Sequence, residues 1–275
     1  FKSRIFYFYT SMNSSITHPI GIFDSGIGGT SIWKEIHALL PAENTLYLSD
    51  SKHAPYGEKS KDKIIELSIK NTEFLLEQNC KLIVVACNTA TTNAINVLRN
   101  TYAVPFIGIE PAIKPAAIQT NTNTIGILAT KGTLNSALFE KTSNNLDFNI
   151  NIIEQVGEGL VELIENGKLH SKEMTVLLEK HLSVFLKNNI DCLVLGCTHY
   201  PYLIPQIKKI IGPQITIIDS GEAVAKQTKK VLEKNQLIHL GSPSKNCQFY
   251  SNKEIDSLSE VLHAYKNVSI EKLAF

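Results

Sequence analysis

The fold is decided by Leu82-Ile83-Val84-Val85-Ala86-Cys87-Asn88-Thr89-Ala90, because a stretch much further along the chain repeats its form. The second stretch reads Asp191-Cys192-Leu193-Val194-Leu195-Gly196-Cys197-Thr198-His199-Tyr200-Pro201. In each, a short apolar run is typical of a buried strand, and a cysteine followed by small polar residues comes at its carboxyl end. Cys87 and Cys197 therefore mark two similar units, which can place their thiols face to face.

Apolar runs of strand length alternate with helical patterns along the chain. A helix is expected at Lys61–Glu77 with Ser60 as its N-cap, and another at residues 173–186, with Val176 on its apolar side. Such alternation predicts the α/β class, with parallel sheets and helical crossovers. The expected strands are residues 19–23, 45–48, 82–86, 106–109, 124–128, 151–155, 193–195 and 215–218.

Internal similarity favours two domains over one barrel. A single (β/α)8 barrel would suit a chain of 275 residues. However, residues 20–25 are echoed by residues 125–130, just as the Cys87 strand is echoed by the Cys197 strand. We therefore expect two similar α/β domains with mostly parallel sheets and the active site at the domain interface.

The expected domain boundaries follow from these echoes. They are an N-terminal extension at 1–18, in which Met12 is a candidate start, a first domain at 19–110 plus 221–275, and a second domain at 111–220. The crossing points are expected at residues 110–111 and 219–221. Beyond residue 221 the chain is expected to return to the first domain as helix.

Composition argues against several classes of function. The net charge is +1 and arginine occurs only at Arg4 and Arg99, so nucleic acid is not an expected partner. No apolar run is long enough to span a membrane, and no membrane partner is expected. The 5 cysteines include no Cys-x-x-Cys pair, so neither a zinc site nor a disulfide framework is expected. Reduced thiols in the cytoplasm are the simpler interpretation.

Two loops carry further candidate residues. The turn Asp24-Ser25-Gly26-Ile27-Gly28-Gly29-Thr30 follows the first strand, and its amides could bind an anion at a helix N-terminus. It lacks the G-x-G-x-x-G spacing of nucleotide sites, and a plain tight turn is also possible. Asp24 stands where ligands of such sheets bind, beyond the carboxyl end of a strand. The loop Pro55-Tyr56-Gly57 is shaped by its proline and glycine and either covers the site or is an ordinary turn.

The thiol turns suggest acid–base chemistry. A thiol at a helix N-terminus has its thiolate favoured by the helix dipole. The Asn and Thr side chains that follow Cys87 and Cys197 can bind carboxylate oxygens where no arginine is available. His199 either assists a proton transfer and tunes Cys197, or only caps the turn.

Together these stretches resemble the aspartate/glutamate racemase family, and the turns at residues 24–29 and 55–57 point to its glutamate branch. The resemblance runs from about residue 20 to residue 221. It implies two α/β domains with the site between them, and interconversion of L-glutamate and D-glutamate that supplies peptidoglycan. It also implies a cytoplasmic homodimer that uses no cofactor and no metal.

The resemblance also implies roles for individual residues. Cys87 and Cys197 would be the two acid–base residues, with Cys197 acting on the L isomer and Cys87 on the D isomer. Asp24 and His199 would assist them. Glu165 would be the catalytic glutamate, although residues 155–158 before its helix depart from the family's form. The implied substrate-binding residues are Asp24, Ser25, Pro55, Tyr56, Gly57, Asn88, Thr89, Thr130, Thr198 and His199.

Two other interpretations stay open. One is an aspartate racemase or a related thiol isomerase that acts on another small dicarboxylate. The other is a binding or regulatory protein on a racemase scaffold. The paired thiols together with Asp24 and His199 argue against the second, because a scaffold without chemistry would be free to lose one of them.

Overall fold

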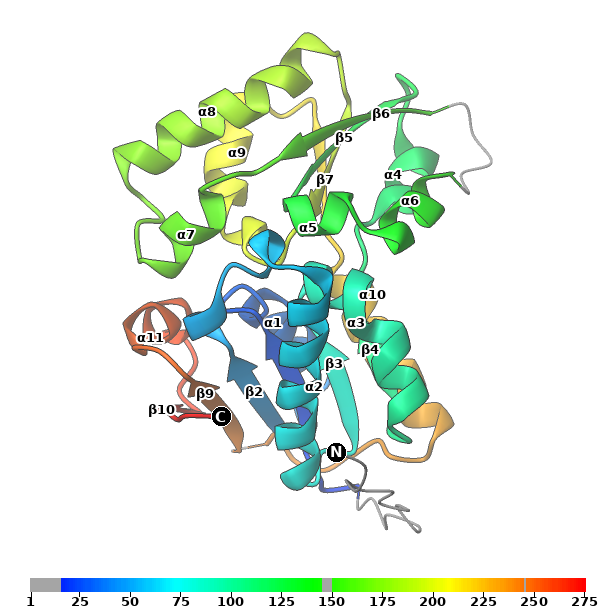
Figure 1. Cartoon of the computed structure of the whole chain (residues 1–275), viewed down its shortest axis with the longest axis vertical. Helices are drawn as coiled ribbons and strands as arrows, with labels where there is room; N and C mark the ends of the chain where they lie inside the picture. Colours follow the sequence, from blue (N-terminus) through cyan, green and yellow to red (C-terminus); the bar gives the residue numbers. More distant parts are fainter. Residues whose placement is uncertain (1–15, 145–149, 245) are drawn as a thin grey trace.

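A computed structural model describes residues 16–144, 150–244 and 246–275 of the chain. Two lobes lie one above the other, each built on a parallel sheet flanked by helices (Figure 1). Within the described ranges, no helix combines the length and apolar character needed to cross a bilayer. Most of the expected N-terminal extension, including Met12, lies outside the described residues.

The strands form two sheets whose neighbours all run parallel. They are β1 (Ile20–Asp24), β2 (Thr45–Ser49), β3 (Leu82–Val85), β4 (Phe106–Gly108), β5 (Thr124–Ala129), β6 (Asn151–Val156), β7 (Cys192–Gly196), β8 (Thr216–Ile218), β9 (Cys247–Ser251) and β10 (Val268–Lys272). The first sheet has 6 strands in the order β10-β9-β2-β1-β3-β4, and the second has 4 in the order β6-β5-β7-β8.

The two sheets share one topology. The order β2-β1-β3-β4 in the first corresponds to β6-β5-β7-β8 in the second. The strands that echo each other in sequence therefore occupy matching places: β1 matches β5, and β3 matches β7. Strands β1, β3 and β7 are buried along their whole length because helices cover both sheet faces, which explains their continuous apolar runs. The prediction of two similar α/β units is confirmed, and the barrel is excluded.

Helices connect the strands. The α-helices are α1 (Thr30–Leu39), α2 (Lys61–Glu77), α3 (Asn88–Thr101), α4 (Ile113–Gln119), α5 (Lys131–Leu134), α6 (Ala137–Asn144), α7 (Leu160–Glu165), α8 (Lys172–Lys187), α9 (Ile204–Ile211), α10 (Gly221–Lys234) and α11 (Asp256–Leu262). Short 3-10 helices are η1 (Ser51–His53), η2 (Tyr56–Glu58) and η3 (Tyr200–Leu203). Helix α2 has the predicted bounds, and the Ser60 Oγ accepts a hydrogen bond from the Lys63 amide at 3.3 Å.

Helix α8 corrects one detail of the predicted apolar face. Its buried residues recur with helical spacing from Met174 through Leu178 to Phe185. Val176 follows Met174 by two residues, which places it on the opposite side of the helix, and it is 65% exposed. The prediction that Val176 belongs to the apolar side is therefore wrong.

The C-terminal region is only partly helical. As expected, α10 follows residue 221 and packs on α1 in the first lobe. The chain then adds β9 and β10 to the edge of the first sheet beside β2, which the sequence did not predict. Burial alternates along β9 and β10 is half exposed, so neither has the continuous apolar run of the inner strands.

The two chain crossings lie side by side. The Ser220 Oγ donates a hydrogen bond to the Glu110 carbonyl at 2.5 Å, so the segment leaving the first lobe touches the segment returning to it. On this arrangement we propose the division into 19–110 plus 221–275 and 111–220. In this division the carboxyl ends of β1, β3, β5 and β7 face the space between the lobes.

Candidate active site

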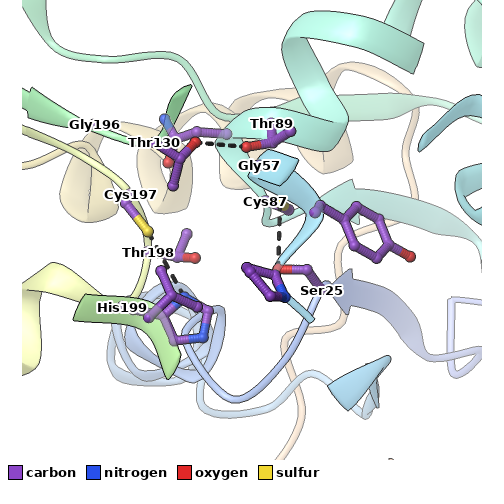
Figure 2. A pocket seen from close by; sticks show the side chains of 13 residues that line it. Ser25, Gly57, Cys87, Thr89, Thr130, Gly196, Cys197, Thr198 and His199 are labelled. Carbon is purple, nitrogen blue, oxygen red and sulfur yellow. Dashed lines mark hydrogen bonds between the residues drawn. The ribbon is translucent and has the colours of Figure 1, made fainter. Parts of the chain in front are cut away.

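A cavity lies between the lobes. It is lined by residues that follow the carboxyl ends of β1, β3, β5 and β7, where parallel sheets bind ligands. In Figure 2, Cys197 and His199 lie on one side of it, and Cys87 and Ser25 on the other. The lining residues are Ser25, Pro55, Tyr56, Gly57, Cys87, Asn88, Thr89, Thr130, Val161, Gly196, Cys197, Thr198 and His199.

The cavity therefore brings together most of the residues that the sequence singled out. Two of them, Asp24 and Glu165, stand behind the lining and contact residues that form it. Val161 and Gly196 were not predicted. Val161 lies on α7 between the predicted turn and Glu165, whereas Gly196 is the small residue directly before the second thiol.

Cys87 is the N-cap residue of α3. Its Sγ accepts a hydrogen bond from the Ala90 amide at 3.4 Å and donates one to the Ser25 Oγ at 3.7 Å. Burial, and then the charge of Asp24, raise the pKa of the Cys87 thiol well above its usual range. Cys87 therefore rests as a neutral thiol, which is the proton-donating form.

Cys197 has a different local setting from the one that the matching turns predicted. The Tyr200 amide binds the Cys197 carbonyl at 3.1 Å, and the chain enters the 3-10 helix η3 before α9 begins. The thiol thus does not cap an α-helix. Instead its Sγ lies 3.7 Å from the Nδ1 of His199, two residues on. An imidazole, rather than a helix N-terminus, is therefore the polar group beside the Cys197 Sγ.

His199 is itself held by Glu165. The His199 Nε2 lies 2.6 Å from the Glu165 Oε1, and both side chains are buried. The same carboxylate accepts hydrogen bonds from the Ile27 amide at 2.6 Å and the Ser51 Oγ at 2.7 Å. The row Cys197, His199, Glu165 thus runs from the cavity into the contact between the lobes.

The ionisation of this row follows from its contacts. Burial raises the pKa of Glu165, but hydrogen bonds from His199, Ser51 and Ile27 outweigh it and hold the pKa below its usual value. Burial lowers the pKa of His199, but its bonds to Cys197 and Glu165 outweigh that effect and raise the pKa well above its usual value. These contacts favour the protonated form of His199, which lies between the Cys197 sulfur and the Glu165 carboxylate.

The Gly28 amide nitrogen is also close, at 3.2 Å from the His199 Nε2. When the Nε2–H group donates a hydrogen bond to Glu165, this nitrogen has no lone pair free to accept a hydrogen bond from the Gly28 amide. The amide is therefore a packing neighbour of the ring, not its hydrogen-bond donor. This closeness leaves no room for a side chain at Gly28, where an added Cβ would lie 2.3 Å from the His199 Nδ1.

The glycine-rich loop binds the protein's own carboxylates. The Gly29 and Gly26 amides donate to the Asp24 Oδ2 at 2.9 and 3.3 Å, and the Ile27 amide donates to Glu165. The loop is thus an anion site, as one interpretation of its sequence expected, but side chains of this chain occupy it. An added Cβ at Gly26 would lie 2.0 Å from the Glu165 Oε1, which explains the glycine there.

Asp24 is fully buried at the end of β1. Its Oδ1 accepts a hydrogen bond from the Thr198 Oγ1 at 3.4 Å, across the lobes. Burial raises the pKa of Asp24 to about 6, against the opposing effects of His199 and the Gly29 amide. Asp24 therefore changes its charge near the lower end of the physiological pH range.

Asn88 carries polar side-chain atoms that are suited to contact a polar ligand. Its side-chain nitrogen and oxygen are buried at the cavity and have no hydrogen-bond partner within the described part of the chain. Buried amides are normally paired, so this pair of atoms is suited to a bound molecule. Nearby, the Thr89 and Thr130 hydroxyls lie 2.8 Å apart and join the two lobes.

The sequence analysis missed Asp50, which follows β2. The Tyr56 hydroxyl donates a hydrogen bond to it, so Tyr56 presents its ring rather than its hydroxyl to the cavity. The Asn252 side chain, just after β9, donates to the Asp50 Oδ1 at 2.5 Å. The signal was available, because Asp50 stands beyond β2 much as Asp24 ends β1 on the neighbouring strand.

Comparison with known proteins agrees with this geometry. Residues 20–228 match the family model described as Asp/Glu/Hydantoin racemase. A glutamate racemase from Ralstonia pickettii is 43% identical over 92% of this chain and 89% of its own length. A racemase structure from Picrophilus torridus, of an aspartate racemase, is 19% identical with a TM-score of 0.54 and shows likeness of fold alone.

Two solved structures carry glutamate. The Escherichia coli glutamate racemase in complex with L-glutamate and the activator UDP-MurNAc-ala is 32% identical, with a TM-score of 0.82 over 94% of this chain and 98% of that chain. The Francisella tularensis glutamate racemase in complex with D-glutamate is 30% identical, with a TM-score of 0.80 over 94% and 97%.

Twin parallel sheets with one thiol each at a shared cavity define an α/β isomerase of the racemase class. The family match covers most of the chain, and the relatives named above agree with it. The chain belongs to the Asp/Glu/Hydantoin racemase family.

Proposed function

We propose that this chain is a glutamate racemase that moves a proton through Cys87 and Cys197. The observation that carries the proposal is that two cysteines from different lobes line one cavity. Support for glutamate as substrate comes from relatives that are glutamate racemases and from homologous structures that hold either isomer. By family resemblance, the D-glutamate formed supplies peptidoglycan.

The proton moves in two steps. With L-glutamate bound, the Cys197 thiolate takes the proton from Cα, and the electron pair stays on carbon as a carbanion. The Cys87 thiol then donates its proton to the opposite face of Cα, so that the product is D-glutamate and Cys87 is left as thiolate. The D isomer reacts by the same steps in reverse, starting from the form in which Cys87 is the thiolate and Cys197 the thiol. Each such acid–base contact contributes roughly 10²–10⁴ in rate.

The surroundings of each thiol suit these roles. His199, held by Glu165, lies beside the Cys197 Sγ, whereas burial raises the pKa of Cys87 and favours its thiol form. Carbanion formation needs a site that excludes water and has fixed dipoles. We assign the unpaired Asn88 amide, with the Thr89 and Thr198 hydroxyls, to the substrate carboxylates. The remaining contacts, from Ser25, Pro55, Tyr56, Gly57 and Thr130, would shape the cavity around the substrate chain.

The test uses single substitutions at each thiol. Cys87→Ala and Cys197→Ala are each expected to abolish racemisation in both directions, measured by circular dichroism from pure L-glutamate and pure D-glutamate. Cys80→Ala is the matched control, because Cys80 is buried just before β3 and does not line the cavity. In deuterated water the wild-type product is expected to carry deuterium at Cα. A single-thiol variant with near wild-type racemisation would refute the scheme.

Substrate choice, assembly and location need their own measurements. Assaying L-aspartate beside L-glutamate tests the alternative of an aspartate racemase. The homodimer implied by the family resemblance stays a prediction, and sedimentation of the purified chain tests it. The cytoplasmic location also stays a prediction, to be tested by cell fractionation.

A further inference from the structure

Tyr47 is a fully buried tyrosine on β2 whose hydroxyl reaches the glycine-rich loop. The hydroxyl donates a hydrogen bond to the Gly26 carbonyl at 2.8 Å. The ring packs against Phe249 of β9, with centroids 5.3 Å apart. An added Cβ at Gly29 would meet the Tyr47 hydroxyl at 2.7 Å, so this hydroxyl lies directly beneath the loop.

The amides of the loop above Tyr47 bind two buried carboxylates. Within one short segment the amides of Gly26 and Gly29 bind Asp24, and the amide of Ile27 binds Glu165. Asp24 and Glu165 then contact Thr198 and His199 of the thiol turn in the other lobe. A shift of the loop would therefore disturb both carboxylates together.

The contact between Tyr47 and the glycine-rich loop is made by the hydroxyl, whereas the ring serves packing. Packing against Phe249 needs a ring but no oxygen, and a phenylalanine would fill the same space. A buried hydroxyl is retained at low energetic cost only when it is paired, and here its partner is the carbonyl of a loop glycine.

We propose that Tyr47 is a positioning residue for the racemisation: its hydroxyl fixes the Gly26 carbonyl and thereby aims the loop amides at Asp24 and Glu165. This inference rests on the proposed function. Tyr47 does not line the cavity, so it acts through the loop and not on the substrate.

The experiment compares Tyr47→Phe with Thr45→Val. Thr45 lies on the same strand, is buried, and accepts a hydrogen bond from the Trp33 Nε1 at 2.9 Å, away from the cavity. Both variants lose buried hydrogen bonding and nearly keep their shape, so both thermal midpoints are expected to fall. The readouts are hydrogen exchange of the Ile27 and Gly29 amides, and kcat/KM against pH.

Tyr47→Phe is expected to speed hydrogen exchange of the Ile27 and Gly29 amides. It is expected to lower kcat/KM about tenfold, as for loss of one hydrogen bond. The acid limb of the pH profile of kcat/KM is expected to move to higher pH, because amides held less firmly stabilise the Asp24 and Glu165 carboxylates less. Thr45→Val is expected to leave all of these at wild-type values. Unchanged amide exchange in Tyr47→Phe, or equal effects in both variants, would overturn the inference. So would faster exchange with wild-type kinetics. A wild-type chain without racemase activity would refute the proposed function, whereas amide exchange would still decide whether Tyr47 holds the loop.

Discussion

Glu165 and His199 form a 2.6 Å contact that is anchored from the opposite lobe. The Ile27 amide and the Ser51 Oγ, both of the first lobe, bind the same carboxylate. The state of the Cys197 thiol therefore depends on how the lobes meet. The proposed proton transfers at Cα use only the two thiols, so His199 and Glu165 would contribute by holding charge and orientation at Cys197.

Glu165→Gln tests this dependence. The amide keeps the size of the side chain but removes the charge that raises the pKa of His199, so the positive charge beside the Cys197 Sγ is weakened. We expect kcat/KM to fall about a hundredfold, within the range of a lost acid–base contribution. The measurement is the initial rate of racemisation from each isomer at several pH values.

The matched control for Glu165→Gln is Glu43→Gln. Glu43 is equally buried and lies 2.6 Å from the Lys81 Nζ, away from the cavity. Breaking that pair is expected to lower the free energy of unfolding by about 3–5 kcal/mol while the folded fraction keeps its kcat/KM. If Glu43→Gln lowered kcat/KM as much as Glu165→Gln does, the loss would reflect stability rather than the Glu165 contact.

Asp24→Asn is expected to lose less stability than wild type as the pH rises from about 4 to 7. The pKa of the folded Asp24 carboxyl, about 6, lies above the usual 3.8, so the wild-type carboxyl contributes stability that is fully present below about pH 4 and is lost as the pH rises through 6. An amide has no charge to bury and escapes this loss. The gain of Asp24→Asn over wild type should grow by up to about 3 kcal/mol between pH 4 and pH 7.

Urea unfolding at a series of pH values measures this trend. Glu179→Gln, at an exposed position in the middle of α8, supplies the control and should show no comparable dependence on pH. A flat difference between Asp24→Asn and wild type across the series would contradict the assigned cause. Racemisation by Asp24→Asn should be strongly reduced throughout, so stability and activity move in opposite directions.

Gly28→Ala tests the close contact between the glycine-rich loop and His199. The new Cβ would overlap the imidazole, which is held by Glu165 and cannot turn freely. We expect the ring to be displaced from the Cys197 Sγ and kcat to fall by about a hundredfold or more. Gly241→Ala is the control, because its Cβ meets only the His239 side chain beside an exposed loop. Wild-type kcat in Gly28→Ala would contradict the contact.

Much of the fold could be predicted from the sequence because the inner strands are buried on both faces. Continuous apolar runs such as Leu82–Val85 have few alternatives to a central parallel strand. The start of α2 was predictable because Ser60 is a typical N-cap residue. The strands β9 and β10 were not predicted because their partly polar sequences depend on strand pairing. Strand β9 pairs with β2, about two hundred residues away in the chain, and β10 pairs with β9.

The site was predictable where it follows strand ends and unpredictable where it depends on contacts between lobes. Cys87, Cys197 and Asp24 come directly after buried runs. Glu165 came only from resemblance, since nothing in the sequence around it shows that it reaches Ile27 of the other lobe. Tyr47 is one apolar-looking residue of a strand, and only the structure shows its hydroxyl beneath the loop.

A crystal structure with D-glutamate bound would show directly where the two cysteine sulfur atoms lie relative to the substrate Cα. We predict the Sγ atoms of Cys87 and Cys197 on opposite faces of the substrate Cα, each within roughly 3–4 Å of it. Two sulfurs on the same face of Cα, or glutamate bound outside the cavity that both thiols line, would contradict the account.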